Sequence, residues 1–139
     1  MDCALADTGV WYAMFVADDP FARDIDKKAE VLDRCQVVVP WPTMYETLRT
    51  KFVKKKPALQ QLRDYLKRPR VQYLDDVLYR EQAMELAFSS ALLGRRPLSM
   101  TDCLIRLIMD DRNVKIDCLA TFNERDFVDV CRKQRIEII

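Results

Sequence analysis

Short apolar runs alternate along the chain with segments in which apolar residues recur every three or four positions. The short runs predict strands at residues 3–6, 37–39, 71–74, 116–120 and 136–139. The spaced patterns predict helices at residues 8–16, 21–34, 43–55, 57–67, 77–93, 99–111 and 124–133, with Gly94 closing one of them. Strands that alternate with helices predict a three-layer α/β/α fold, in which a mostly parallel central sheet is flanked by helices.

The composition is that of an ordinary globular protein. Of the 139 residues, 50% are hydrophobic and 32% are charged, and no linker rich in Gly or Ser divides the chain, so we expect a single domain, 1–139. The formal net charge is only +1, so any nucleic-acid-binding surface has to be a local basic patch. We expect no membrane span and no secretory signal, and therefore a cytoplasmic protein.

Residues of two types limit the possible chemistry. The chain contains no histidine, which excludes histidine-based catalytic triads and histidine metal ligands. Its five cysteines are scattered and never form a closely spaced pair, which argues against a zinc site. We expect the cysteines to be reduced and mostly buried.

Acidic residues stand where predicted strands end or predicted helices begin. Asp7 follows the first strand, Glu46 lies one turn into the helix after the second, and Asp102 opens a later helix. Asn123 and Asp126 follow the strand at 116–120. The carboxyl ends of parallel strands share one edge of a sheet, so these side chains are expected to meet there. Such an all-oxygen group would need a cation, and it favours Mg²⁺ or Mn²⁺ and a phosphodiester substrate.

Each of these residues also has a purely structural interpretation. Helix capping would account for Asp7, for Asn123, and for the pairs Thr43–Glu46 and Ser99–Asp102, which have the spacing of a capping box. Asp7, however, interrupts an otherwise apolar segment, and a buried charge at that position needs a partner.

Four segments resemble the motifs of the PIN-domain ribonucleases, and the size of the chain matches the VapC-type toxins of that family. They are residues 6–10 (ADTGV), 45–48 (YETL), 98–105 (LSMTDCLI) and 119–127 (LATFNERDF). The motifs occur in the family's order and extend over nearly the whole chain. The resemblance implies a metal-dependent endoribonuclease, the toxin of a toxin–antitoxin pair, which hydrolyses RNA by in-line attack of a metal-activated water.

The resemblance also implies roles for particular residues. Asp7, Glu46 and Asp102 would be the catalytic acids, with Asp7 and Asp102 holding the main Mg²⁺ or Mn²⁺ ion and Glu46 orienting water or a second ion. Asn123 stands where many relatives carry an aspartate, so Asn123 and Asp126 are weaker candidate ligands. The hydroxyls of Thr8 and Thr101 would support the acids. The implied partners are RNA, an antitoxin protein and a second copy of the chain.

A run of basic residues follows the second acidic motif, and it has three possible roles. It consists of Arg49, Lys51, Lys54, Lys55 and Lys56. This segment could hold an RNA backbone, contact a protein partner, or simply form a solvated helix face.

Two alternatives to the nuclease remain. The chain could be a PIN-fold module that binds RNA or a protein but cleaves weakly, because Asn123 is a neutral ligand. A phosphatase or phospho-receiver domain also places acids at strand ends, but the chain lacks the second acid that either would need near Asp7.

Overall fold

The computed structural model describes residues 1–139, except for the side chain of Thr50. A five-stranded sheet forms the middle layer of the molecule. Its strands are β1 (Cys3–Ala6), β2 (Gln36–Pro40), β3 (Val71–Leu74), β4 (Cys118–Ala120) and β5 (Glu137–Ile138). They lie in the order β3-β2-β1-β4-β5, and every neighbouring pair is parallel. The predicted α/β fold is therefore confirmed, and the sheet is parallel throughout.

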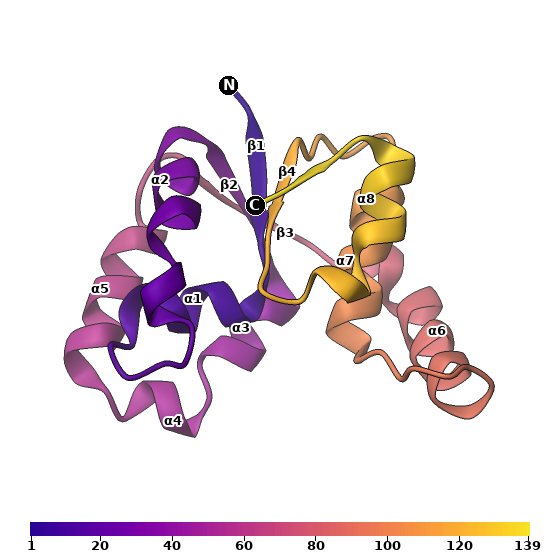
Figure 1. Ribbon diagram of the computed structural model, residues 1–139, viewed down its shortest axis with the longest axis horizontal. Coiled ribbons are helices and arrows are strands. Elements are labelled where there is room, and N and C mark those ends of the chain that lie inside the picture. The colour runs from indigo at the N-terminus through magenta and orange to yellow at the C-terminus, as the bar shows by residue number, and fades with distance from the viewer.

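Helices cover both faces of this sheet, which gives the three layers (Figure 1). One face carries α1 (Thr8–Phe15), α2 (Asp26–Arg34), α3 (Trp41–Thr47), α4 (Thr50–Val53) and α5 (Lys56–Leu66). The other carries α6 (Arg80–Leu92), α7 (Met100–Asp110) and α8 (Val128–Gln134). Side chains alternate across β1, so Ala4 and Ala6 pack on the first set of helices and Leu5 on the second. The strand is buried on both faces, which explains why it reads as a continuous apolar run.

Three predicted helices begin with a separate 3₁₀ turn, which corrects their predicted starts. These turns are Ala22–Asp24, Val77–Tyr79 and Glu124–Asp126, and the α-helices after them start at Asp26, Arg80 and Val128. A 3₁₀ turn has 3.0 residues per turn against 3.6 for an α-helix. Over a single turn the two patterns point almost the same side chains inward, so periodicity does not separate them.

The single helix predicted at 43–55 is wrong, because the chain breaks into α3 and α4. Leu48 and Arg49 leave the helical conformation between them, with ψ angles of 48° and 170°. The break turns Phe52 into the core, where it is fully buried with its ring centroid 5.0 Å from that of Tyr12. Leu48, four residues before Phe52, is instead 47% exposed.

The five cysteines are buried and free, as predicted. Burial raises the pKa of Cys118 to about 12 and that of Cys131 to about 11, so both thiols stay protonated and pack as small apolar groups. Within the described part of the chain, no helix combines the length and the apolar content that crossing a membrane requires.

Gly94 directly follows Leu93, the C-cap of α6, which is the position predicted for it, but it does not adopt the left-handed conformation usual there. Among the described residues, positive φ occurs only at Arg135, after α8, where φ is 58°. What Gly94 supplies is space, because a Cβ built on it would lie 2.8 Å from the carbonyl oxygen of Ser90. The chain therefore passes close to the last turn of α6 only if position 94 has no side chain.

Gly94→Ala should lower the free energy of unfolding by about 1–3 kcal/mol, because the added methyl group meets backbone that cannot move aside easily. Gly9→Ala in α1 is the matched control. Nothing lies within 4 Å of a Cβ at Gly9, and alanine favours a helix over glycine by up to about 1 kcal/mol. Urea denaturation of both variants measures the difference, and equal effects would contradict the steric explanation.

Candidate active site at the carboxyl ends of the strands

Asp7 is the residue at which the central strand turns into the first helix. Its backbone N–H donates to the carbonyl of Ala120 in β4 at 2.9 Å, because β1 and β4 are paired in register up to this point. One carboxylate oxygen accepts from the backbone N–H of Thr8 at 2.8 Å, and the other accepts from the hydroxyl of Thr121 at 3.0 Å. Asp7 is therefore the N-cap of α1, as the structural alternative predicted, and it is held rigidly at the sheet edge.

Glu46 reaches the same place from α3. The hydroxyl of Thr8 donates to its carboxylate at 3.1 Å, which joins the first acidic motif to the second. The capping-box interpretation of Glu46 is wrong, since Pro40 is the N-cap of α3 and the Thr43 hydroxyl donates to the Pro40 carbonyl at 2.7 Å. Glu46 therefore does not cap α3, and its carboxylate lies next to Thr8, the residue that follows Asp7.

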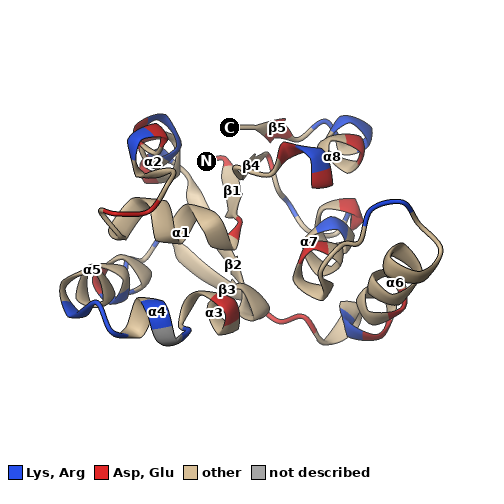
Figure 2. Cartoon of the chain, turned by 60° about the horizontal axis from the view of Figure 1, so that its bottom comes forward, with Lys and Arg blue, Asp and Glu red and all other residues tan. Residues whose placement is uncertain are grey.

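Asp102 enters the site from the first turn of α7. The side chain of Ser99 caps this helix by accepting from the backbone N–H of Asp102 at 3.0 Å, so the capping interpretation is correct for Ser99. The cap fixes where the helix starts and therefore where the Asp102 carboxylate lies. Figure 2 shows that the acidic positions at the end of β1, on α3 and on α7 surround one central region.

The pKa values of these acids show that they interact. The pKa of Asp7 is raised from 3.8 to about 6, first by burial, then by the charge of Asp102 and to a smaller extent by that of Glu46. Hydrogen bonds from Thr8 and Thr121 oppose the rise without cancelling it. Burial also raises the pKa of Asp102, with like charges adding to the effect. Three segments that are distant in the sequence therefore bring mutually repelling carboxylates together.

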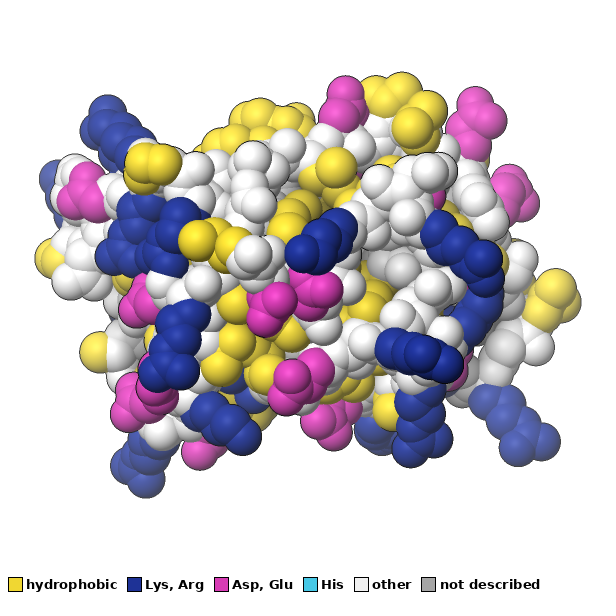
Figure 3. Space-filling model, turned by 90° about the horizontal axis from the view of Figure 1, so that it is seen from above, with side chains coloured by type: hydrophobic (Ala, Val, Ile, Leu, Met, Phe, Trp, Pro, Cys, Tyr) yellow, Lys and Arg dark blue, Asp and Glu magenta, His cyan; other side chains and the backbone are white. Residues whose placement is uncertain are grey.

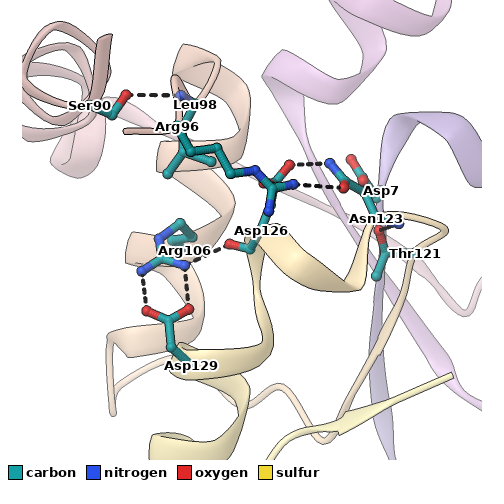
Figure 4. Close-up of polar contacts among 9 residues, drawn as sticks. All are labelled: Asp7, Ser90, Arg96, Leu98, Arg106, Thr121, Asn123, Asp126 and Asp129. Carbon is teal, nitrogen blue, oxygen red and sulfur yellow. Dashed lines mark hydrogen bonds and ion pairs between the residues drawn. The ribbon is translucent and has the colours of Figure 1, made fainter. Parts of the chain in front are cut away.

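Asn123 and Asp126 lie beside this group and hold an arginine that sequence reasoning did not assign (Figure 4). Arg96, from the loop between α6 and α7, forms an ion pair with the buried Asp126 at 2.5 Å and donates to the Asn123 side-chain oxygen at 3.4 Å. The Asn123 amide donates to the same carboxylate. Arg106 of α7 also donates to the backbone carbonyl of Asp126, at 2.6 Å, which fixes the turn. Asp126 is therefore already engaged with a cation, and Asn123 is exposed.

The arrangement does not form a closed metal cage. Within the described residues, no group of three or more acidic or thiol side chains is positioned to hold an ion. Thr101 is buried and lines a small pocket together with Glu46, but across the described chain its hydroxyl makes no hydrogen bond to an acid. The donor set at the sheet edge is nevertheless entirely oxygen, and Mg²⁺ needs only one or two protein carboxylates because water fills its other positions.

The basic residues after Glu46 lie on and around α4, beside α3 (Figure 2). Arg49, Lys51, Lys54 and Lys56 are exposed, while Lys55 forms an ion pair with Asp18 at 3.2 Å. The face at the amino ends of the strands, in contrast, mixes basic and acidic side chains (Figure 3). The run of basic charge thus sits on the flank of the acidic site.

Thr121 and Arg96 were given no role on the basis of the sequence, although the sequence contained a signal for Thr121. Thr121 directly follows β4, so the parallel register that places Asp7 at the sheet edge places Thr121 beside it. Arg96 had no such signal, because the path of a loop is not encoded in a periodic pattern.

Asp7→Asn should stabilise the metal-free protein at pH 7 by about 1–3 kcal/mol. Because the folded state holds the Asp7 proton more tightly than the unfolded state, its contribution to stability is full below pH 4 and is lost as pH rises through 6. Asparagine caps the helix equally well and removes the charge. Urea denaturation at pH 7 and at pH 4 should show a gain at pH 7 that shrinks at pH 4, with the exposed Asp33→Asn as a control that changes little at either pH. A loss of stability at pH 7 would contradict this.

Comparison with protein-family models gives no match for the chain, and comparison with curated proteins gives none either. The assignment of the site therefore rests on its geometry and on the four motifs.

Proposed function

We infer that the chain is a metal-dependent endoribonuclease of the PIN-domain type, the toxin of a toxin–antitoxin pair. The observation that carries this proposal is that Asp7, Glu46 and Asp102 lie close enough at the carboxyl edge of a parallel sheet for their charges to interact, and that burial, with these acidic neighbours adding to it, raises the pKa of Asp7 to about 6. Like charges gathered in a partly buried site favour the binding of a hard cation. A polyanionic substrate would otherwise be repelled from such a site.

Asp7 and Asp102 would hold Mg²⁺ or Mn²⁺, and Glu46 would orient water or a second ion. The donor set fits such an ion, because all the side chains offer oxygen and none offers imidazole or thiolate. When bound, the ion acts as a Lewis acid that activates water and offsets charge on the phosphate. Binding should weaken below pH 6, where Asp7 takes up a proton.

The surrounding residues hold the acids in place. Thr121 and the backbone N–H of Thr8 hold the two oxygens of Asp7, and the Thr8 hydroxyl holds the Glu46 carboxylate. These hydrogen bonds support the proposal that Thr8 positions the acids. Thr101 lines the pocket next to Glu46. Rigid placement matters because catalysis requires the reacting groups to be held within fractions of an ångström.

Features beside the acids suit single-stranded RNA. Tyr45 is 76% exposed at the rim of the pocket that contains Glu46, where a base could stack on its ring. The exposed cations around α4 lie next to α3 and are available to phosphates. Arg96 has a further part in this proposal, because a guanidinium at the edge of the site can contact a phosphate oxygen once Asp126 is occupied by a metal.

An apolar groove supports the proposal of an antitoxin partner. Leu48, Leu59, Leu62 and Leu66 line it together with Tyr73 of the edge strand, and its rim carries Arg63 and Lys67. A groove of this composition suits the apolar face of an amphipathic helix with acidic flanks. We place this interaction, like the nuclease, in the cytoplasm.

One observation favours the second candidate function, a PIN-fold module that binds RNA or protein and cleaves weakly. Asp126 is paired with Arg96 and Asn123 is neutral, so the side chains after β4 are not free to complete a metal site. Melting temperature with and without Mn²⁺ separates the two candidates. A metal that relieves the repulsion around Asp7 raises the melting temperature, whereas a module without a metal site shows no shift and no cleavage.

Single substitutions Asp7→Asn, Glu46→Gln and Asp102→Asn should each reduce the rate of RNA cleavage by at least about 100-fold, because each removes a charge that the ion requires. Cleavage of single-stranded RNA in Mg²⁺ or Mn²⁺, with a chelator as blank, measures this. Glu30→Gln is the matched control, since Glu30 is an exposed acid on α2. Cleavage that survives all three substitutions, or that persists in the chelator, would refute the proposal.

Lys54→Glu combined with Lys56→Glu should weaken RNA binding and reduce the slope of log K against log salt concentration by about 2, because two phosphate contacts are lost. Fluorescence anisotropy in an Asp102→Asn background avoids cleavage during the titration. Arg112→Glu with Lys115→Glu is the control, because these residues lie beyond the far end of α7. If both pairs of substitutions act equally, α4 is not the RNA-binding surface.

A further inference from the structure

A small pocket lies between α3 and α7 and adjoins the acidic site. Its volume is about 190 Å³, below the roughly 300 Å³ at which pockets for drug-sized ligands begin, so it suits a single ring system. The acidic stretch after β3 runs past α3 toward α6 and contributes Asp76 to the wall of this pocket (Figure 2). We refer to this space as the α3–α7 pocket, and the residues that matter to its chemistry are Tyr45, Glu46, Asp76 and Thr101.

The hydroxyl of Thr101 lines the α3–α7 pocket without a hydrogen-bond partner. Only 8% of Thr101 is exposed, and within the described chain no group donates to its hydroxyl or accepts from it. The hydroxyl does not belong to the fully enclosed unpaired atoms of the described residues, so it keeps contact with the open space of the pocket. A largely buried hydroxyl without a partner is costly. A ligand that hydrogen-bonds to Thr101 would remove this cost.

Asp76 offers the same pocket a fixed and charged acceptor. It is 6% exposed, and its two carboxylate oxygens accept from Nε of Arg80 at 2.9 Å and from Nη2 at 3.2 Å. The hydrogen bonds from Arg80 lower the pKa of Asp76 below its ordinary value, so the carboxylate stays ionised at neutral pH. A carboxylate has about four lone-pair sites, of which Arg80 uses two. Because Arg80 already supplies positive charge, Asp76 still suits neutral N–H donors rather than a second cation.

We propose that the α3–α7 pocket binds a guanine base of the RNA substrate. The base-pairing edge of guanine carries two adjacent donors, N1–H and N2–H, beside the acceptor O6. Asp76 accepts from the donors, and the Thr101 hydroxyl donates to O6. Adenine, cytosine and uracil lack two adjacent donors, so none of them satisfies both residues in this way. Tyr45, 76% exposed at the rim, supplies a ring on which the base stacks.

The position of the pocket relates this base to the bond that is cleaved. Glu46 lines the pocket, and its carboxylate also accepts from the Thr8 hydroxyl next to Asp7. A guanosine bound here therefore lies beside the phosphodiester at the acids. The inference rests on the proposed function, because the ligand has to be RNA, and it adds a requirement of its own, which is the selection of one base.

Binding of short single-stranded RNAs that differ only in their central base tests the proposal. In fluorescence anisotropy with an Asp102→Asn background, the RNA with a central guanosine should bind at least about tenfold more tightly than those with adenosine, cytidine or uridine, because hydrogen bonds matched to one base edge discriminate to this extent. Equal affinity for the four RNAs would overturn the proposal, even if the wild-type chain cleaves RNA. A preference for guanosine without any cleavage by the wild type would support the pocket and refute the nuclease.

Substitutions in the pocket test the two base contacts separately. Thr101→Val removes the hydroxyl and keeps the shape of the side chain, so it should reduce the preference for guanosine at least about threefold, whereas Thr101→Ser should retain it. Asp76→Asn replaces one acceptor and should reduce the preference similarly. Asp75→Asn is the matched control, since the Asp75 side chain is exposed and accepts from the backbone N–H of Val77 at 3.0 Å.

Affinity for the RNA with a central uridine should stay the same in all these variants, which separates loss of the base contact from loss of the fold. Circular dichroism checks the fold directly. A preference for guanosine that survives both Thr101→Val and Asp76→Asn would refute the assignment of the pocket, as would an equal loss in Asp75→Asn.

Discussion

Repulsion among carboxylates at one edge of a parallel sheet is the constraint on which the functional part of the structure depends. Asp7 is fixed by the start of α1 and by Thr121, and it cannot move away from Asp102 and Glu46 without giving up these hydrogen bonds. The fold therefore retains a repulsion between carboxylates that lowers the stability of the protein when no ligand is bound. Arrangements of this kind are typical of binding and catalytic sites, where a ligand compensates the charge.

The surrounding polar groups divide into those that fix the acids and one that neutralises them. Thr8, Thr121 and Ser99 fix geometry through hydrogen bonds between 2.8 and 3.1 Å, and they leave the negative charge in place. Arg96 instead supplies positive charge to Asp126. The group at the sheet edge is thus asymmetric, because Asp7, Glu46 and Asp102 repel one another while Asp126, after β4, has an internal counterion. The two proposed functions differ on this point, because a strong nuclease needs Asp126 or Asn123 to help hold the ion and a binding module does not.

The position of Arg96 links the acidic site to the end of α6. Its loop passes close to the end of that helix because Gly94 has no side chain, and Ser90 fastens the loop at Leu98. The same loop therefore joins the end of α6 to Asp126.

The sequence by itself determined the order of strands and helices, the parallel sheet and the places where acids would stand. Apolar periodicity and the residues that end a strand are local properties, and they sufficed to bring Asp7, Glu46 and Asp102 into one hypothesis. Only the tertiary structure decided the break between α3 and α4, because it depends on the fit of Phe52 against Tyr12. It also decided which of the acids cap a helix and which residue pairs with Asp126, because these depend on contacts between segments that lie far apart in the chain. The role of Gly94 depends on how closely the loop passes the last turn of α6.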